Sequence, residues 1–276
     1  MAERKSLVKD EKVENTLKNI KYKIMVISGK GGVGKSFITA NLAMAAAMKN
    51  YSTGILDADI HGPTIPRMLG LRSKKPSISP IGILPVSGPL DVKVISMDFL
   101  IPDDDSPVIW RGPLKTAALK QFIADVLWGK LDMLFIDLPP GTGDESLSIA
   151  QMVRPDYAVV VTLPSEVSSQ IVRKVITFSR ILKVPILGVI ENMSYYKCSK
   201  CGAVSYPFGK GGGLKMAKYM NTPFLGGIPI VDEISEACDK GEPYILNHKA
   251  SEISKIFFKI IDGISGRVSG ENQKDG

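Results

Sequence analysis

One glycine-rich stretch constrains the fold of this chain more than any other. It lies between an apolar run at 24–27, typical of a buried strand, and a helical pattern at 37–48. Strand, glycine-rich turn and helix form the context that a phosphate-binding loop requires, with the spacing G-x-x-x-x-G-K-[ST]. The stretch fits that spacing and reads Gly29-Lys30-Gly31-Gly32-Val33-Gly34-Lys35-Ser36.

The chemistry of such a loop assigns a task to each residue type. Glycines let successive backbone N–H groups point at a polyphosphate, and the helix N-terminus adds partial positive charge. We expect Lys35 to reach the β- and γ-phosphates and Ser36 to bind Mg²⁺. Lys30 is a second lysine, which one nucleotide does not require. It is either a solvated surface residue or a group that points toward a neighbouring molecule.

Three aspartates are expected at the carboxyl edge of the sheet, where α/β folds place their ligands. Asp57 and Asp59 follow a short strand at 53–56, although aspartates there could simply cap a helix. Asp137 ends an apolar run at 131–136, which is the Walker-B pattern for holding Mg²⁺. The turn that follows, at 138–144, is typical of a switch that senses the γ-phosphate.

Asn192 follows an expected strand at 184–190 and could bond an adenine edge with its amide. Position 195 is Tyr, where a guanine-reading N-K-x-D motif would have Asp. ATP is therefore favoured over GTP, and an Asn in an ordinary turn is the structural alternative.

Cys198 and Cys201 form a C-x-x-C pair with Gly202 directly after it. Zn²⁺ and a [4Fe–4S] cluster both need four ligands, and Cys238 is the only other cysteine. Cys238 lies in an expected helix at 234–240, as a small buried apolar residue. A two-fold dimer would supply four thiolates from Cys198 and Cys201. A shared iron–sulfur cluster, a shared structural zinc and a redox C-x-x-C all remain open.

Composition limits the remaining possibilities. The chain has 276 residues, 44% of them hydrophobic, and we expect one doubly wound, mostly parallel α/β domain at 21–264. A charged leader at 1–20 and a polar tail at 265–276 flank it, and the C-x-x-C insertion spans 195–208. Three cysteines fit a reducing cytoplasm. The lysines behind the net charge of +7 are scattered, and no apolar run reaches membrane-spanning length, so neither nucleic acid nor a membrane is expected as a partner.

The other elements follow from periodicity. Residues 72–90, rich in Ser, Pro and Gly, are expected to be irregular. The remaining strands are expected at 92–97, at 158–163 and within 223–230, and helices at 114–128, 145–152, 165–182, 209–220 and 253–264.

With Lys30 in the loop, the sequence resembles the deviant phosphate-loop ATPases, which include nitrogenase iron protein, MinD and ParA. That resemblance implies a homodimer in which Lys30 crosses the interface to the partner's phosphates and acts in catalysis with Lys35. It also implies that Asp59 orients or activates the attacking water, and that Asp57 supports Mg²⁺ without touching it.

The full set of motifs resembles the Mrp/ApbC group of iron–sulfur cluster carrier ATPases. The motifs are the loop, the C-x-x-C, and the segments 57–64, 110–113, 137–144 and 191–194. The resemblance implies slow ATP hydrolysis and a labile [4Fe–4S] cluster, held between two subunits and passed to apo-proteins. No cysteine precedes Cys198, so the chain resembles the short form without an N-terminal cysteine cluster. The alternative is a ParA- or MinD-like positioning ATPase with a zinc staple.

Overall fold

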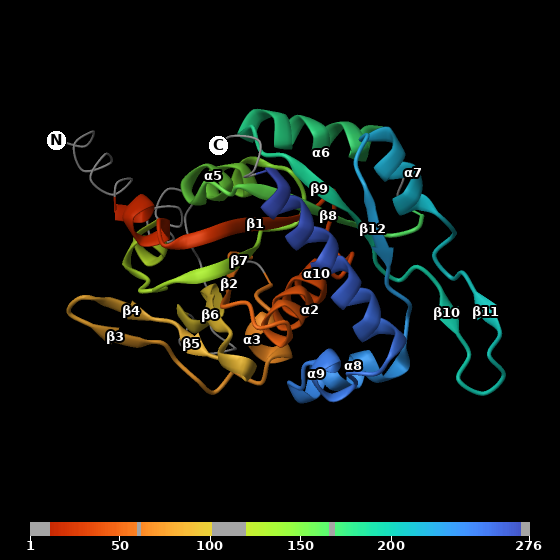
Figure 1. The fold of residues 1–276 in the computed structure, drawn as a ribbon, viewed down its shortest axis with the longest axis horizontal. Helices are drawn as coiled ribbons and strands as arrows, with labels where there is room; N and C mark the ends of the chain where they lie inside the picture. The colour runs from red at the N-terminus through yellow and green to blue at the C-terminus, as the bar shows by residue number, and fades with distance from the viewer. Residues whose placement is uncertain (1–11, 60–61, 101–119, 166–168, 272–276) are drawn as a thin grey trace.

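The computed structural model describes residues 12–59, 62–100, 120–165 and 169–271. Its centre is an eight-stranded sheet in the order β12-β9-β8-β1-β7-β2-β6-β5 (Figure 1). Every neighbouring pair is parallel except β5 with β6. The predicted doubly wound, mostly parallel α/β fold is confirmed.

The strands at the centre of the sheet are buried on both faces, which explains their continuous apolar sequences. The bounds are β1 Ile20–Ser28, β2 Thr53–Asp57, β5 Val86–Ser87, β6 Lys93–Ser96, β7 Leu131–Asp137, β8 Tyr157–Thr162, β9 Ile186–Glu191 and β12 Phe224–Gly227. The chain first builds the sheet on one side of β1 and later on the other. The strand order therefore reverses beside β1, and such a reversal is where open α/β sheets bind ligands.

Helices cover both faces, so the molecule has three layers. Along β1, Ile24 and Val26 enter one core while Met25 and Ile27 enter the other, because successive side chains of a strand point to opposite faces. The first core packs against α2 Lys35–Met48, α3 Ile65–Met68, α8 Asp232–Lys240, α9 Tyr244–Asn247 and α10 Glu252–Glu271. The second packs against α5 Asp144–Val153, α6 Ser169–Leu182, α7 Gly212–Tyr219 and helices at 12–17 and 120–125.

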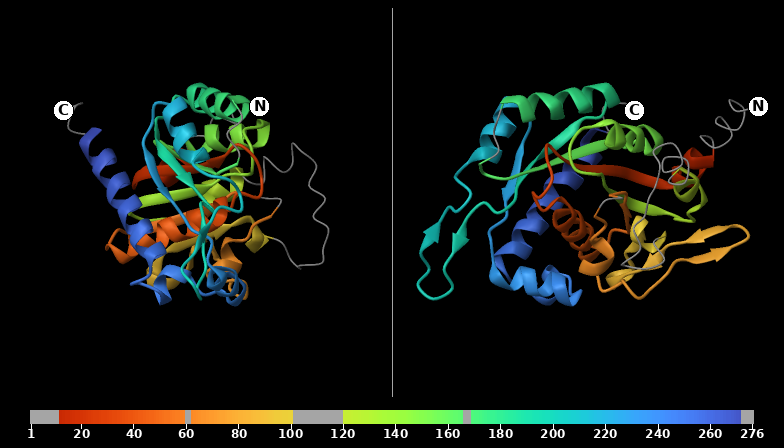
Figure 2. Two further views of the ribbon diagram at one scale, coloured as in Figure 1. Left: turned by 90° about the vertical axis from the view of Figure 1, so that its right-hand side faces the viewer. Right: turned by 180° about the vertical axis from the view of Figure 1, so that it is seen from behind.

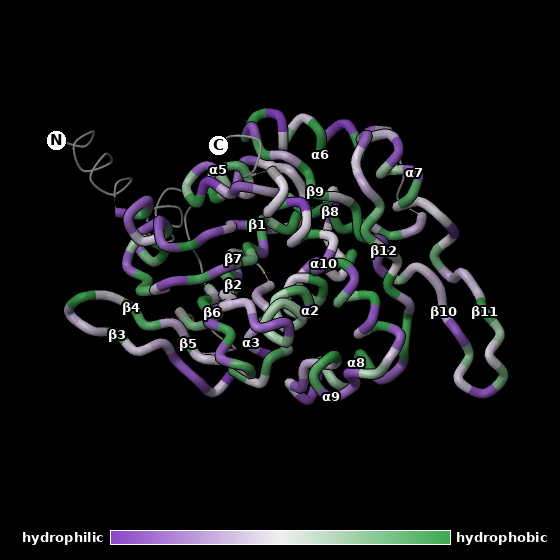
Figure 3. Tube along the Cα trace, viewed as in Figure 1, coloured by the Kyte–Doolittle hydropathy of each residue, from purple (hydrophilic) through white to green (hydrophobic). Residues whose placement is uncertain are grey.

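Two short antiparallel ribbons project from opposite ends of the molecule (Figure 2). One joins β3 Ser77–Ser79 to β4 Gly82–Leu84, and the other joins β10 Tyr196–Lys197 to β11 Val204–Ser205. The first ribbon corrects the expectation of irregular structure at 72–90. We call residues 195–208, which contain the second ribbon and both vicinal cysteines, the cysteine arm. Colouring by hydropathy shows mixed polar and apolar residues along the arm (Figure 3).

Two expected helix boundaries also change. Helix α10 runs through 265–271, where a polar tail was expected, and Val268 is buried within that stretch. The helix expected at 114–128 is described only from residue 120 and ends at 125. Among the described residues, no helix is both long and apolar enough to cross a membrane.

Candidate nucleotide and metal sites

The glycine-rich loop joins the end of β1 to the start of α2 at the carboxyl edge of the sheet. A cavity of about 260 Å³ opens over it. Residues brought to this cavity from elsewhere are Asp59 after β2, Thr64 and Met68 around α3, and Pro140 after β7. Lys30, Lys35 and Ser36 line the same cavity, so the fold gathers the loop, the first acidic segment and the predicted second switch around one space.

Backbone geometry explains two of the loop glycines. Gly32 and Gly34 both have φ of +79°, a conformation that side chains other than glycine rarely adopt. A Cβ atom at Gly34 would also lie 2.2 Å from Asn192 Nδ2, whereas one at Gly32 would meet nothing within 4 Å. Asn192 is that close because its Nδ2 donates a hydrogen bond to the Val33 carbonyl at 2.8 Å. The end of β9 is thus tied to the phosphate loop.

Asp137 is the polar centre of the region beneath the glycine-rich loop. Ser36 Oγ donates to its Oδ2 at 2.5 Å, and Thr39 Oγ1 donates to its Oδ1 at 2.7 Å. Lys35 Nζ lies 2.7 Å from the same Oδ1 as a buried ion pair, yet the ammonium has no well-directed hydrogen bond. A buried ammonium group beside the loop cavity is suited to receiving a phosphate oxygen.

Asp57 lies directly beside Asp137 because β2 and β7 pair in register at these two residues. Both carboxylates are fully buried, and Ser96 Oγ donates to Asp57 Oδ2 at 2.8 Å. Burial, followed by repulsion from Asp137, holds the pKa of Asp57 well above its ordinary value. Two buried carboxylates beside the Ser36 hydroxyl are oxygen ligands of the kind that Mg²⁺ prefers. The donor set therefore fits this ion.

A second cavity, of about 460 Å³, continues from the phosphate site and shares Gly34 and Phe37 with it. We call it the base cavity. Its walls are mostly apolar, and the side-chain amide of Asn192 adds polar atoms to one of them. The other lining residues come from the end of β9, the cysteine arm, the turn after β12 and helix α8: Met193, Phe208, Pro229, Ile230, Val231, Ile234, Ser235 and Cys238. A flat apolar ring with a polar edge, such as a purine base, matches this lining.

Cys198 and Cys201 lie at the tip of the cysteine arm in a tight knuckle. Cys198 N donates to the Ala203 carbonyl and Gly202 N to the Cys198 carbonyl, both at 2.9 Å. Hydrogen bonds from the backbone N–H groups of Cys201 and Lys200 lower the pKa of the Cys198 thiol. Cys201 is exposed. In the part of the chain that the structure describes, no group of three or more metal-ligating side chains occurs, so this pair is an incomplete ligand set.

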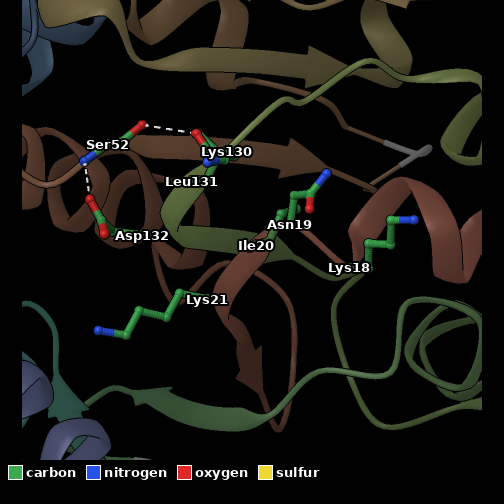
Figure 4. A pocket seen from close by; sticks show the side chains of 8 residues that line it. All are labelled: Lys18, Asn19, Ile20, Lys21, Ser52, Lys130, Leu131 and Asp132. Atoms are coloured by element: carbon green, nitrogen blue, oxygen red, sulfur yellow. Dashed lines mark hydrogen bonds between the residues drawn. The ribbon is translucent and has the colours of Figure 1, made fainter.

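A third cavity, of about 330 Å³, lies at the opposite, amino edge of the sheet (Figure 4). Lys18, Lys21 and Lys130 line it, and Asp132 accepts a hydrogen bond from Ser52 N at 2.8 Å beside them. The carboxyl edge holds every residue expected to bind nucleotide, so this cavity is separate from the nucleotide site.

Sequence patterns did not reveal Thr39, Ser96 or Phe208 as site residues. Thr39 lies one helical turn after Lys35, a spacing that would place both side chains on one face of α2. Ser96 and Phe208 carried no comparable signal. Two of the motif segments lie wholly or partly outside the described residues: the segment 110–113, and residues 60–61 of the segment 57–64. Cys238, expected to be a buried apolar residue, is instead partly buried and lines the base cavity.

Comparison with known proteins gives a consistent result. The model of the ParA family, described as NUBPL iron-transfer P-loop NTPase, matches residues 19–265. An iron–sulfur cluster carrier protein of Saccharolobus solfataricus is 54% identical over 257 residues, which cover 92% of this chain and 86% of that protein. The cytosolic Fe-S cluster assembly factor CFD1 of Kluyveromyces lactis is 45% identical over 271 residues, covering 94% and 96%.

Solved structures agree with the fold. A nucleotide-binding protein of Archaeoglobus fulgidus, in complex with ADP and with cobalt found in it, superposes with a TM-score of 0.78 at 38% identity, covering 90% of this chain and 96% of that one. The cell-division ATPase MinD of Pyrococcus furiosus superposes with a TM-score of 0.64 at 22% identity, covering 89% and 99%, which supports the fold alone. The family match spans most of the sequence, and the chain therefore belongs to the Mrp/NUBPL family of iron–sulfur cluster carrier P-loop NTPases, which have the ParA/MinD-type fold.

Proposed function

We propose that this chain binds and slowly hydrolyses ATP, and that two copies together carry a [4Fe–4S] cluster to apo-proteins. The observation that carries the proposal is the position of the vicinal thiols. Cys198 and Cys201 offer two of the four ligands that a cluster needs, at the tip of an arm whose attached end lies at the base cavity. Only a second copy of the same arm completes the set without recruiting another kind of ligand.

On the nucleotide side, the loop from Gly29 to Gly34 cradles the phosphates, and Lys35 binds the β- and γ-phosphates. The base of ATP occupies the base cavity, with Asn192 at its polar edge. One N–H of the Asn192 amide already bonds Val33, so its second N–H and its carbonyl oxygen are the groups offered to adenine. Ser36 and Asp137 would hold Mg²⁺, with Asp57 supporting the ion without touching it, and the ion would neutralise phosphate charge.

For hydrolysis, we assign Asp59 to orienting or activating the attacking water. It lines the cavity over the glycine-rich loop together with Lys35, and its backbone N–H donates a hydrogen bond to Asp57 Oδ1 at 3.3 Å. Lys30 is exposed at the mouth of the same cavity, a position from which it can approach the phosphates of a second subunit. Two nucleotides sandwiched between two chains would bias the dimer between states that hold and release the cluster.

The cargo side rests on thiolate chemistry. Backbone N–H groups stabilise a thiolate at Cys198, and thiolates are the ligands of iron–sulfur clusters. The exposure of Cys201 leaves the cluster accessible to an acceptor, which fits a carrier better than a permanent redox centre. We place this activity in the cytoplasm, in line with the odd cysteine count and with the name of the yeast relative.

Anaerobic reconstitution with iron and sulfide tests the proposal. We expect a brown protein with about four iron atoms per two chains, one [4Fe–4S] cluster. Cys198→Ser and Cys201→Ser should each lose the colour, and Cys238→Ser should keep it. The brown protein should then activate an apo-enzyme that needs a [4Fe–4S] cluster. Colourless protein that takes up stoichiometric zinc would contradict the proposal and favour a structural zinc site.

A further inference from the structure

Both ends of the cysteine arm lie at the base cavity: the outgoing limb, which begins at 195, follows two residues that line it, and the return limb, which ends at 208, contributes one. On the return limb, Phe208 lines the cavity directly and is 41% exposed. The outgoing limb follows Asn192 and Met193, which also line the cavity. The ribbon that carries the vicinal cysteines therefore has both of its ends at the place where a base would sit.

The outgoing limb is fastened to the opposite wall of the same cavity. Ile230 N donates to the Tyr195 carbonyl at 2.7 Å, and Tyr196 forms an isolated parallel bridge with Ile230. Ile230 is itself a lining residue. Backbone pairing therefore joins the wall formed after β12 to the outgoing limb.

The two limbs are paired up to the knuckle. Tyr196 pairs with Ser205 and Lys197 with Val204 in β10 and β11, and Cys198 N bonds the Ala203 carbonyl beyond them. A hydrogen-bonded ribbon therefore connects the limb that ends at Phe208 to the knuckle that carries both thiols.

We propose that Phe208 is a base-binding residue that links occupancy of the base cavity to the order of the cysteine arm in the same subunit. This inference rests on the nucleotide site proposed above. A purine ring bound beside Asn192 packs on the Phe208 ring, buries its exposed face and holds the return limb. Aromatic contacts of this kind favour offset or edge-to-face packing and add to the burial of area.

This link differs from a γ-phosphate switch. ADP and ATP carry the same base, so both should order the arm to the same extent, and inorganic triphosphate should not. The coupling is also reciprocal. If nucleotide raises the affinity of the arm for a ligand by some factor, that ligand must raise the affinity of the protein for nucleotide by the same factor.

Nucleotide titration of the metal-free protein tests the first part. Phe208→Ala should weaken ADP binding about 3–10-fold, the range of one aromatic contact, and leave inorganic triphosphate binding unchanged. Phe208→Tyr should restore ADP binding. Tyr206→Ala is the matched control, since Tyr206 is on the same limb, equally exposed at 42%, and absent from the cavity lining.

Hydrogen exchange over residues 196–205 tests the link itself. In the wild type, ADP should slow exchange there and inorganic triphosphate should not; in Phe208→Ala, ADP should lose that effect. Equal weakening of ADP and triphosphate binding would mean a structural defect and would overturn the inference. Unchanged ADP affinity, or ADP protection of the arm that persists in Phe208→Ala, would also overturn it. Neither measurement involves iron, so a failure of cluster assembly would remain separable from a failure of this inference.

Discussion

Lys35 Nζ lies 2.7 Å from Asp137 Oδ1, inside the protein, and Lys35 lines the cavity over the glycine-rich loop. The ion pair holds the ammonium in place before any nucleotide arrives, and Ser36 and Thr39 satisfy the same carboxylate. The groups that would meet the terminal phosphates are therefore positioned in advance, which lowers the cost of binding.

Lys35→Ala should abolish most ATP turnover. Removing one preorganised donor from a developing charge typically costs about 100-fold in rate or more. Lys49→Ala is the control, because Lys49 follows the last residue of the same helix and pairs with Asp262 at the surface. Steady-state phosphate release checks both variants. Near-normal turnover in Lys35→Ala would contradict its assignment.

Lys30→Ala separates the two lysines of the loop. If Lys30 acts on the partner's phosphates, the variant should bind ATP like the wild type as a monomer, yet lose ATP-dependent dimerisation and most turnover. Calorimetric ATP titration and sedimentation in the presence of ATP measure the two effects. A variant that dimerises and hydrolyses ATP normally would show that Lys30 is only a solvated surface residue.

Gly34→Ala and Gly32→Ala form a matched pair, since both positions have φ of +79° and share the same backbone strain. Only Gly34→Ala also forces a Cβ onto Asn192. We expect Gly32→Ala to cost about 1 kcal/mol and Gly34→Ala clearly more. The double variant Gly34→Ala with Asn192→Ala should recover part of that difference. Thermal unfolding measures all of them, and equal destabilisation of the two single variants would rule out the predicted clash.

The two loop glycines illustrate how far the sequence could predict this site. Spacing alone identified the loop, because strand, loop and helix are contiguous, and it identified Asp137 because an apolar strand precedes it. The contact between Gly34 and Asn192 joins residues far apart in the chain and depends on β9 and β1 both flanking β8. The role of Phe208 is harder still to predict from sequence, because its position in the base cavity depends on the path of a projecting arm.

The sequence analysis did not predict the hairpin at 77–84 or the last turns of α10, and each omission has a physical reason. In the hairpin at 77–84, Ile78 is 80% exposed, so its strands show no buried apolar face for a pattern to reveal. At the end of α10, Gly263, Gly266 and Gly270 lower the helix propensity, yet packing of Ile264 and Val268 into the core keeps the chain helical.

Alkylation of reduced, metal-free protein should distinguish Cys238 from Cys201. Burial is the first cause of the raised pKa of the Cys238 thiol, and repulsion from Asp239 adds to it. The reactive thiolate of Cys238 therefore becomes the major form only at a pH above 9.0, the ordinary pKa of a cysteine thiol. We expect iodoacetamide to modify exposed Cys201 faster than Cys238 at pH 8, and ATP to slow the modification of Cys238 by covering it in the base cavity. Mass spectrometry of the labelled peptides measures this, and equal rates at the two cysteines with and without ATP would contradict the described cavity.

The most direct measurement of the central claim is native mass spectrometry of the anaerobically reconstituted protein. If two half sets of ligands meet around one cluster, the spectrum should contain a species of two 29.9-kDa chains with a single [4Fe–4S] cluster. When wild-type and Cys198→Ser chains are mixed, dimers of one wild-type and one variant chain should carry no cluster. A cluster bound to one chain alone, or paired chains that never take up iron, would contradict the shared site.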